Sequence, residues 1–313
     1  MVTKISTTKM SREEWLEHRR NSIGGSDTAA LLGLDEYRSP YSLWCEKVGK
    51  MIPEDISDKE AVRLGNDLED YVAKRFMEAT GKKVRKDNHI IYNDQHPYAH
   101  ANIDRAVIGE NAGLECKTTS SWEILQQCRD GQFPDRWYTQ MVHYMMVTGA
   151  EKWYLGVLVL GRGFYHFEIE RDEAEIEALA SAENEFWQYV TCNTAPPLDG
   201  TEATQDALKT ILADSTPGHS IDLTAVSHHL NLYLALKDQI KEYQDQLYEH
   251  QAHIMNFMQD AESGKFDKTT VTFKSQTRQI FDRKAFEADN GKVPEIYFNT
   301  STSRPFRVST RKR

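Results

Sequence analysis

The sequence predicts a mixed α/β fold (α+β), with a central mixed β-sheet flanked by helices, in the first two thirds of the chain. Three observations predict it. Segments with helical periodicity come first, a run of strand-like segments follows, and further helices close the region. Helices that flank a group of strands in this way can pack on the sheet, which buries the apolar faces of both.

Capping and periodicity place four helices before the first strand. Ser11 begins a capping-box pattern that opens a short helix. A small-residue helix is expected over 28–32, with Ser26 as its N-cap. Two more are expected over 40–48 and from about 57 to 80, the last because apolar residues recur at helical spacing.

Alternating and apolar segments then predict the sheet and the helices that follow it. Glycine-containing turns separate several of these segments, as at 109–113 and 161–163. The expected strands are 83–92, 99–108, 113–118, 152–160 and 163–170, and the expected helices are 121–129, 135–148 and 172–191.

Composition divides the chain into two parts. Residues 1–195 form the α/β domain, and residues 196–313 form a C-terminal extension after a linker that contains proline and glycine. The extension has a long helix (about 224–260), a short hairpin (269–274 and 278–281) and a basic tail. Histidines and tyrosines interrupt the heptad-like seam of the helix, so we expect it to pack on its own domain or on a partner.

The composition predicts a globular protein of the reducing cytoplasm. Hydrophobic residues are 39% of 313, enough for a sizeable core. No apolar run approaches the length of a membrane span, and the first ten residues lack the apolar segment of a signal peptide. The four cysteines form no CxxC pair, which argues against structural zinc, an iron–sulfur cluster or a disulfide framework.

The net charge of −10 disfavours a nucleic-acid partner at first sight, but the charge is unevenly distributed. Residues 264–313 contain twelve Lys and Arg against five Asp and Glu, a net of +7, so the preceding 263 residues carry −17. A basic end on an acidic body can bind a polyanion locally, although such tails are often only solvated ends.

Two strands near the middle of the chain carry the most informative residues. If Leu114 and Cys116 face a core, Glu115 and Lys117 share the opposite face, because side chains alternate along a strand. Asp104 on the neighbouring strand can reach the same point. Two carboxylates that hold Mg²⁺, beside a lysine that positions the attacking water, suit phosphodiester hydrolysis. The alternative is a solvated hairpin face, where these residue types are common.

Two helices carry side chains that could complete such a site. Glu69 lies near the buried stripe of the long helix, so its carboxylate could join the metal ligands, although a surface glutamate is the simpler interpretation. Gln140 and Tyr144 are one helical turn apart on one face. They could bind a substrate phosphate or steady the lysine, or they could be ordinary surface residues.

A glycine-rich turn near the N-terminus follows two arginines. Arg19 and Arg20 precede Gly24-Gly25 and Ser26, at the start of the expected small-residue helix. Guanidinium groups, a hydroxyl and free backbone N–H groups together suit a terminal phosphate. Taken alone, such a turn is a common capping arrangement.

The order of these motifs resembles one nuclease family. An anion-binding turn, a helix glutamate, a strand aspartate, a strand ExK and a helix QxxxY follow one another from Trp15 to Trp187. The chain is similar to the phage-type alkaline exonucleases of the lambda exonuclease and YqaJ-like viral recombinase family, within the PD-(D/E)xK nuclease superfamily. The resemblance implies a restriction-endonuclease-like core and Mg²⁺-dependent (or Mn²⁺-dependent) digestion of linear duplex DNA from the 5′ end.

The resemblance also implies partners and residue roles. Relatives act on double-stranded DNA ends with a single-strand annealing protein, some as ring-shaped trimers, in bacterial or phage-infected cells, and bind no membrane. Asn102 departs from the hydroxyl that some relatives carry there. By motif, the metal ligands are Asp104, Glu115 and the Cys116 carbonyl; the other catalytic residues are Lys117, Glu69 and Gln140; the 5′-phosphate and DNA contacts are Arg19 or Arg20, Ser26, Asn102 and Tyr144.

Two other functions remain open at this point. A sequence-specific endonuclease of the same superfamily would share the carboxylates and the lysine, but it would need a base-reading element, for which only the C-terminal extension is available. A non-catalytic DNA-binding recombination scaffold would keep the fold without the chemistry. The intact set of Asp104, Glu115, Lys117 and Glu69 argues against a decayed site.

Overall fold

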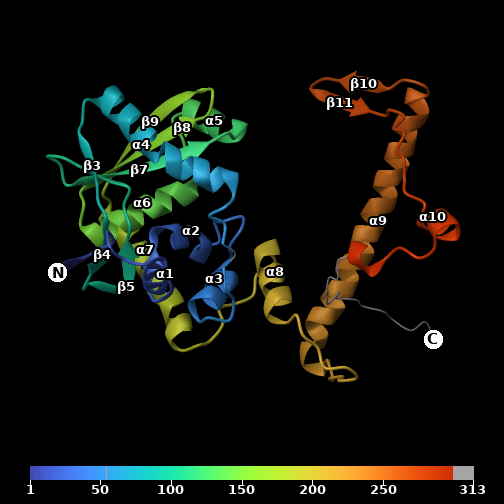
Figure 1. Ribbon diagram of the computed structural model, residues 1–313, viewed down its shortest axis with the longest axis horizontal. Helices are drawn as coiled ribbons and strands as arrows, with labels where there is room; N and C mark the ends of the chain where they lie inside the picture. The colour runs from blue at the N-terminus through green and yellow to red at the C-terminus, as the bar shows by residue number, and fades with distance from the viewer. Residues whose placement is uncertain (54, 299–313) are drawn as a thin grey trace. The chain divides into compact units, whose positions relative to one another are not determined.

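The computed structural model describes residues 1–53 and 55–298, and the chain forms two compact units, Met1–Ala213 and Asp214–Arg313 (Figure 1). The first unit extends beyond residue 195, where we place the domain boundary from the sequence. Helix α8 (Glu202–Ile211) packs on α3 (Pro40–Lys47), and Thr204 Oγ1 donates a buried hydrogen bond to Ser39 Oγ at 2.6 Å. The linker of the sequence analysis therefore leads into a helix of the same unit.

The first unit is built around a five-stranded sheet of order β3-β6-β7-β8-β9. The central pair, β7 and β8, is parallel, and the other neighbouring strands are antiparallel. The mixed sheet expected from the sequence is therefore present. Its strands are β3 (Val84–Lys86), β6 (Arg105–Val107), β7 (Ala112–Thr119), β8 (Lys152–Val159) and β9 (Gly163–Glu170).

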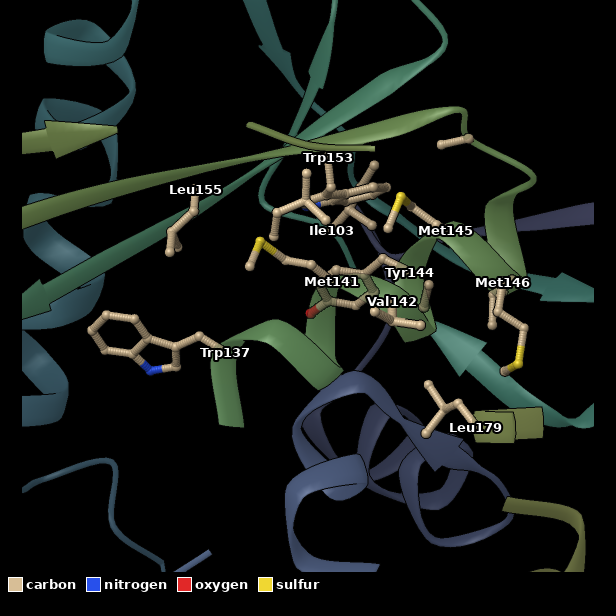
Figure 2. Close-up of a cluster of buried hydrophobic side chains, with 14 of the residues drawn as sticks. Ile103, Trp137, Met141, Val142, Tyr144, Met145, Met146, Trp153, Leu155 and Leu179 are labelled. Atoms are coloured by element: carbon tan, nitrogen blue, oxygen red, sulfur yellow. The ribbon is translucent and has the colours of Figure 1, made fainter. Parts of the chain in front are cut away.

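Different helices cover the two faces of this sheet (Figure 1). On β8, Tyr154 packs with Phe76 of α4, whereas Trp153 and Leu155 pack with residues of α6. Side chains alternate along a strand, so α4 and α6 lie on opposite faces. Figure 2 shows the second face, with Tyr144 of α6 close to Trp153. The helices are α4 (Glu60–Thr80), α5 (Trp122–Arg129), α6 (Asp135–Thr148) and α7 (Glu173–Thr191).

A second sheet, of order β1-β4-β5-β2, corrects two expectations. The segments 83–92 and 99–108, each expected as a single strand, are both divided between the two sheets. Each break contains a carboxylate with a partner elsewhere: Asp87 accepts a hydrogen bond from Lys4 Nζ at 2.8 Å, and Asp104 accepts one from a β7 amide. The strands are β1 (Val2–Ser6), β2 (Ile23–Gly24), β4 (His89–Asn93) and β5 (His96–Ala101).

The N-terminal helices begin with the capping box that the sequence predicts. Ser11 Oγ accepts a hydrogen bond from the Glu14 amide at 3.2 Å, and the Glu14 carboxylate accepts one from the Ser11 amide at 2.8 Å. The expectation that Ser26 caps the next helix is wrong. Ser26 lies inside a 3₁₀ turn, Asp27 takes the N-cap position, and the Ser26 hydroxyl is bound by Arg19. The elements are α1 (Arg12–Arg20), η1 (Gly25–Asp27) and α2 (Thr28–Leu31).

The second unit contains the expected long helix, but its hairpin is shifted. The expected strand 269–274 is β11, whereas its partner β10 precedes it and 278–281 is not a strand. The turn between them holds Asp267 at φ +49°, a conformation that suits a tight two-residue hairpin turn. The elements are η2 (Thr224–Val226), α9 (Ser227–Met258), β10 (Ser263–Phe266), β11 (Thr269–Thr272), α10 (Arg283–Asn290) and η3 (Glu295–Tyr297).

The end of the expected basic tail, from residue 299 onward, lies outside the described residues. Among the helices of the described part of the chain, none is both long enough and apolar enough to cross a bilayer.

Candidate active site

Asp104, Glu115 and Lys117 meet where the start of β6 lies against the middle of β7. Leu114 is buried in the cluster under α4 with Cys116 packed against it, while Glu115 is 3% exposed on the opposite face. Lys117 Nζ lies 2.7 Å from Glu115 Oε1. Asp104 Oδ2 accepts a hydrogen bond from the Cys116 amide at 2.7 Å, which fixes the aspartate against the strand that carries the other two groups. The alternation inferred from the sequence is therefore present on β7.

Lys117 is the first member of a chain of hydrogen bonds that runs into α6. Its Nζ donates to Gln140 Oε1 at 2.8 Å, and Gln140 Nε2 donates to Tyr144 Oη at 2.7 Å. Gln140 and Tyr144 are both buried. The amide is held in one orientation because its carbonyl faces an ammonium and its NH₂ group faces a hydroxyl. The QxxxY pair thus fixes the position of the lysine.

The carboxylates carry more negative charge than the nearby lysine balances. Burial, together with the charges of Glu115 and Glu69, raises the pKa of Asp104 well above its ordinary value. Burial and the charges of Glu115 and Asp104 likewise raise the pKa of Tyr144. Such a cluster of oxygen atoms is stabilised by an added cation.

The donor set fits a hard divalent ion. Among the described residues, Glu115 Oε2 is buried without a hydrogen-bond partner. Carboxylate and carbonyl oxygens are the ligands that Mg²⁺ and Mn²⁺ take. Nowhere in the described part of the chain do three His, Cys, Asp or Glu side chains form a ready-made ligand group. Asp104 and Glu115 could therefore hold an ion only with further donors, such as a main-chain carbonyl, water or substrate oxygens.

Glu69 approaches this site from α4 through an arginine that the sequence analysis missed. Arg105 is 3% exposed, and its guanidinium contacts the Glu69 carboxylate and, at 2.6 Å, both Asp70 Oδ1 and the Asp104 carbonyl. One side chain thus ties α4 to the main chain of a candidate metal ligand. The sequence offers one signal for Arg105, its position directly after Asp104. Its carboxylate partners, Asp70 and Glu69, lie 35 and 36 residues away, so the sequence does not indicate these contacts.

The glycine-rich turn lies beside the same helix. A Cβ added to Gly25 would lie 2.6 Å from a ring carbon of Tyr144 and 3.1 Å from Gln140 Cγ, so only glycine allows this contact. Arg19 Nη2 donates to Ser26 Oγ at 3.0 Å, and its guanidinium lies 4.7 Å from the Trp15 ring centroid. The candidate phosphate-binding pair and the QxxxY residues are therefore neighbours.

A buried ion cluster that the sequence analysis also missed supports this turn. Lys47 Nζ donates to three oxygens: the carbonyls of Arg19 and Ser22 at 2.5 and 2.7 Å, and Asp27 Oδ2 at 2.6 Å. Asp27 also accepts hydrogen bonds from Arg38 and from the amide of Gly24. The charges of Lys47 and Arg38 outweigh burial and hold the pKa of Asp27 well below its usual range.

Two of the expected phosphate contacts are not part of this arrangement. The Asn102 amide donates to the His89 carbonyl at 3.3 Å rather than to the Arg19–Ser26 pair. Arg20 is exposed, and the bond to Ser26 is made by Arg19. This geometry favours Arg19 over Arg20, the choice that the sequence alone leaves open.

Comparisons with known proteins agree with the family resemblance. Residues 14–151 match the YqaJ-like viral recombinase domain. Protein YqaJ of Bacillus subtilis (strain 168) is 38% identical over 304 residues, which cover 96% of this chain and 94% of the relative.

Solved structures show the same fold. The alkaline exonuclease LHK-Exo of Laribacter hongkongensis superposes with a TM-score of 0.50 at 20% identity, over 58% of this chain and 94% of that one. Its complex with dAMP gives a TM-score of 0.51 with the same identity and coverage. The expected nuclease-type fold, a mixed sheet flanked by helices, is therefore confirmed. From the length and identity of the match to the Bacillus protein, the chain belongs to the YqaJ-like viral recombinase family.

Proposed function

We propose that this protein is a metal-dependent deoxyribonuclease that digests linear duplex DNA from the 5′ end. One observation carries the proposal: a partly buried run of polar contacts links Glu115, Lys117, Gln140 and Tyr144, and Tyr144 packs against the turn that holds Ser26. Hydrolytic groups and an anion-binding pair thus lie side by side. The shared fold with an alkaline exonuclease supports the same reaction class.

The chain's own residues divide the work of hydrolysis. Asp104 and Glu115 would hold the divalent ion, with the Cys116 carbonyl as a third ligand. Such an ion supplies Lewis-acid polarisation of the phosphate and a more acidic water. Lys117, held by Gln140, would orient the attacking water and stabilise the negative charge that develops on the phosphate. Glu69, held by Arg105, would provide a further carboxylate on the α4 side.

The Arg19–Ser26 pair would give preference for DNA ends. A terminal phosphate carries more charge and one more free oxygen than an internal phosphodiester, so a guanidinium and a hydroxyl together bind it better. Held there, a 5′ terminus lies next to the QxxxY residues. This adjacency supports a preference for DNA ends, whereas the proposed 5′-to-3′ direction rests on the family to which the chain belongs.

Linear and covalently closed circular duplexes of the same sequence test the reaction class. With Mg²⁺, the linear duplex should be degraded and the circle should remain intact, and a label at each end should leave first from the 5′ terminus. Cleavage of the circle would instead show an endonuclease. Duplex bound but left uncut in Mg²⁺ or Mn²⁺ would favour the non-catalytic scaffold.

Family membership supports two further parts of the proposal. A nuclease that exposes one DNA strand would act with a single-strand annealing protein, in the cytoplasm of a bacterial or phage-infected cell. A homo-oligomeric ring, such as a trimer, would keep the enzyme on its substrate. Co-purification with an annealing protein and the mass of the assembly in solution test these two statements.

A further inference from the structure

An exposed tryptophan with two arginines beside it lies just after the C-terminal end of β7. Trp122 is 58% exposed, and its ring lies under the guanidinium carbons of Arg129 and Arg162, at 5.8 and 5.4 Å from the ring centroid. An exposed indole beside cationic groups offers apolar surface that a ligand can bury, together with charges that attract an anion. Within the described part of the chain, neither arginine forms an ion pair.

The backbone around this cluster is fixed from three sides. Arg162 Nη1 donates to the Ser120 carbonyl at 2.8 Å, which ties the β8–β9 turn to the segment after β7. The Leu160 amide donates to the Thr119 carbonyl at 2.9 Å in the same region. Ser121 Oγ accepts from the Ile124 amide and caps α5, of which Trp122 is the first residue. The backbone that carries the ring is therefore held in place before any ligand arrives, which reduces the entropy lost on binding.

The position of the cluster relates it to the candidate active site. Trp122 follows Lys117 by five residues, so their Cα atoms are at most about 18 Å apart. At the phosphate spacing of one B-form strand this is about five nucleotides. A DNA strand held at the carboxylates can therefore reach the tryptophan.

We propose that Trp122, Arg129 and Arg162 form a stacking site for an unpaired segment of a DNA strand next to the nuclease centre. A flat, exposed aromatic ring takes the face of any base, and the two guanidinium groups attract the phosphates on either side. The exposed carboxylate of Glu123 offsets part of this charge, so stacking rather than charge alone carries the affinity. This inference rests on the proposed function, because digestion of one strand leaves the other without its partner.

Binding of the full-length Lys117→Ala protein to labelled DNA in EDTA tests the stacking site without digestion. On a duplex with a single-stranded extension, adding Trp122→Ala should weaken binding about 5- to 150-fold, the range for loss of one stacked base. Trp122→Phe should keep most of the affinity. Arg129→Gln and Arg162→Gln should each reduce the magnitude of the slope of log binding constant against log salt concentration by about one.

Controls separate this inference from the proposed function. Ile108→Ala removes an exposed apolar side chain near the other end of β7 and should leave binding unchanged. A blunt duplex should show little effect of Trp122→Ala, and thermal unfolding should be unaltered. If Lys117→Ala binds DNA and Trp122→Ala does not weaken it, the stacking site is refuted while the nuclease stands. If an RNA strand binds more tightly than DNA, the ligand assignment is overturned. If no DNA binds, the proposed function itself fails.

Discussion

Lys117 is the single residue on which the proposed chemistry depends most. Its ammonium lies between Glu115 and Gln140, and the role of Gln140 is to hold it there. Sequence alone could predict this pairing because Glu115 and Lys117 are two residues apart on one strand, where alternation fixes their relative position. It could not predict the contact of Arg105 with Glu69, because the sheet and α4 must first be packed together.

Replacing Lys117 with alanine should abolish hydrolysis while DNA binding survives. We expect a loss of at least about 100-fold in the single-turnover rate, the typical effect of removing a group that stabilises the transition state. Quench-flow digestion of a labelled duplex measures it. Lys152→Ala is the matched control, because that lysine is paired with Glu168 on the neighbouring strands and has no place in the site. Undiminished turnover by the Lys117 variant would refute the assignment.

His100 gives a prediction for stability against pH. Ser22 Oγ donates its proton to the His18 carbonyl, so His100 Nδ1 must be the donor in its 2.8 Å contact with that hydroxyl. Burial lowers the pKa of His100 to about 3 in the folded state, against about 6.5 in an unfolded chain. Between these values the unfolded chain binds a proton that the folded protein does not.

Stability should therefore fall as pH drops from about 6.5 toward about 3, and His100 alone should contribute about 1.4 kcal/mol per pH unit. Urea denaturation across this window measures the slope. His100→Asn, which retains an N–H donor, should reduce the slope of unfolding free energy against pH by the equivalent of about one proton. His166→Asn, on an exposed position of β9, should not. An equally steep slope in both variants would contradict this role.

At the scale of elements, periodicity identified the long helices because each repeats its apolar residues within one segment. Strands are different, since their pairing is decided by residues far away. The segments 83–92 and 99–108 each have the pattern of one continuous strand, yet each contributes one strand to each of the two sheets. The hairpin is predicted in the wrong place for a related reason. The sequence indicates the strand that becomes β11, but nothing local shows that its partner precedes it rather than follows it.

The Lys47 cluster joins α1, η1 and α3, and its loss should show in stability first. Lys47→Met leaves Asp27 buried with less compensation, so the free energy of unfolding should fall by about 3–5 kcal/mol. Adding Asp27→Asn removes the buried negative charge and should recover part of the lost stability. Urea denaturation measures both changes. If Lys47→Met is as stable as the parent protein, the Lys47 ammonium does not hold these elements together.

At the scale of the whole molecule, the first unit contains every residue of the candidate site. Its clusters of buried side chains lie within residues 1–213, whereas Met258 is the buried apolar residue among the residues that the structure describes in the second unit. Sequence composition indicated two parts, but it could not show that α8 belongs with the first, because the Thr204–Ser39 contact spans 165 residues.

A fragment of residues 1–213 should therefore fold cooperatively and digest linear duplex DNA. A fragment of residues 1–195, which lacks α8, should be less stable because Ser39 and the cluster under α3 lose their cover. Calorimetry and the digestion assay compare the two. An inactive but folded 1–213 fragment would assign an essential role to the second unit.

The contact of Gly25 with Tyr144 has a consequence for the products. Because ring and turn touch with no space for a methyl group, the turn that holds the proposed phosphate-binding pair lies in direct contact with the helix that holds Gln140. Under the proposed function, this fixed contact would set the length of each released fragment, and that length would stay constant along any template. Under that function, nucleotides would leave in increments of one size whatever their sequence.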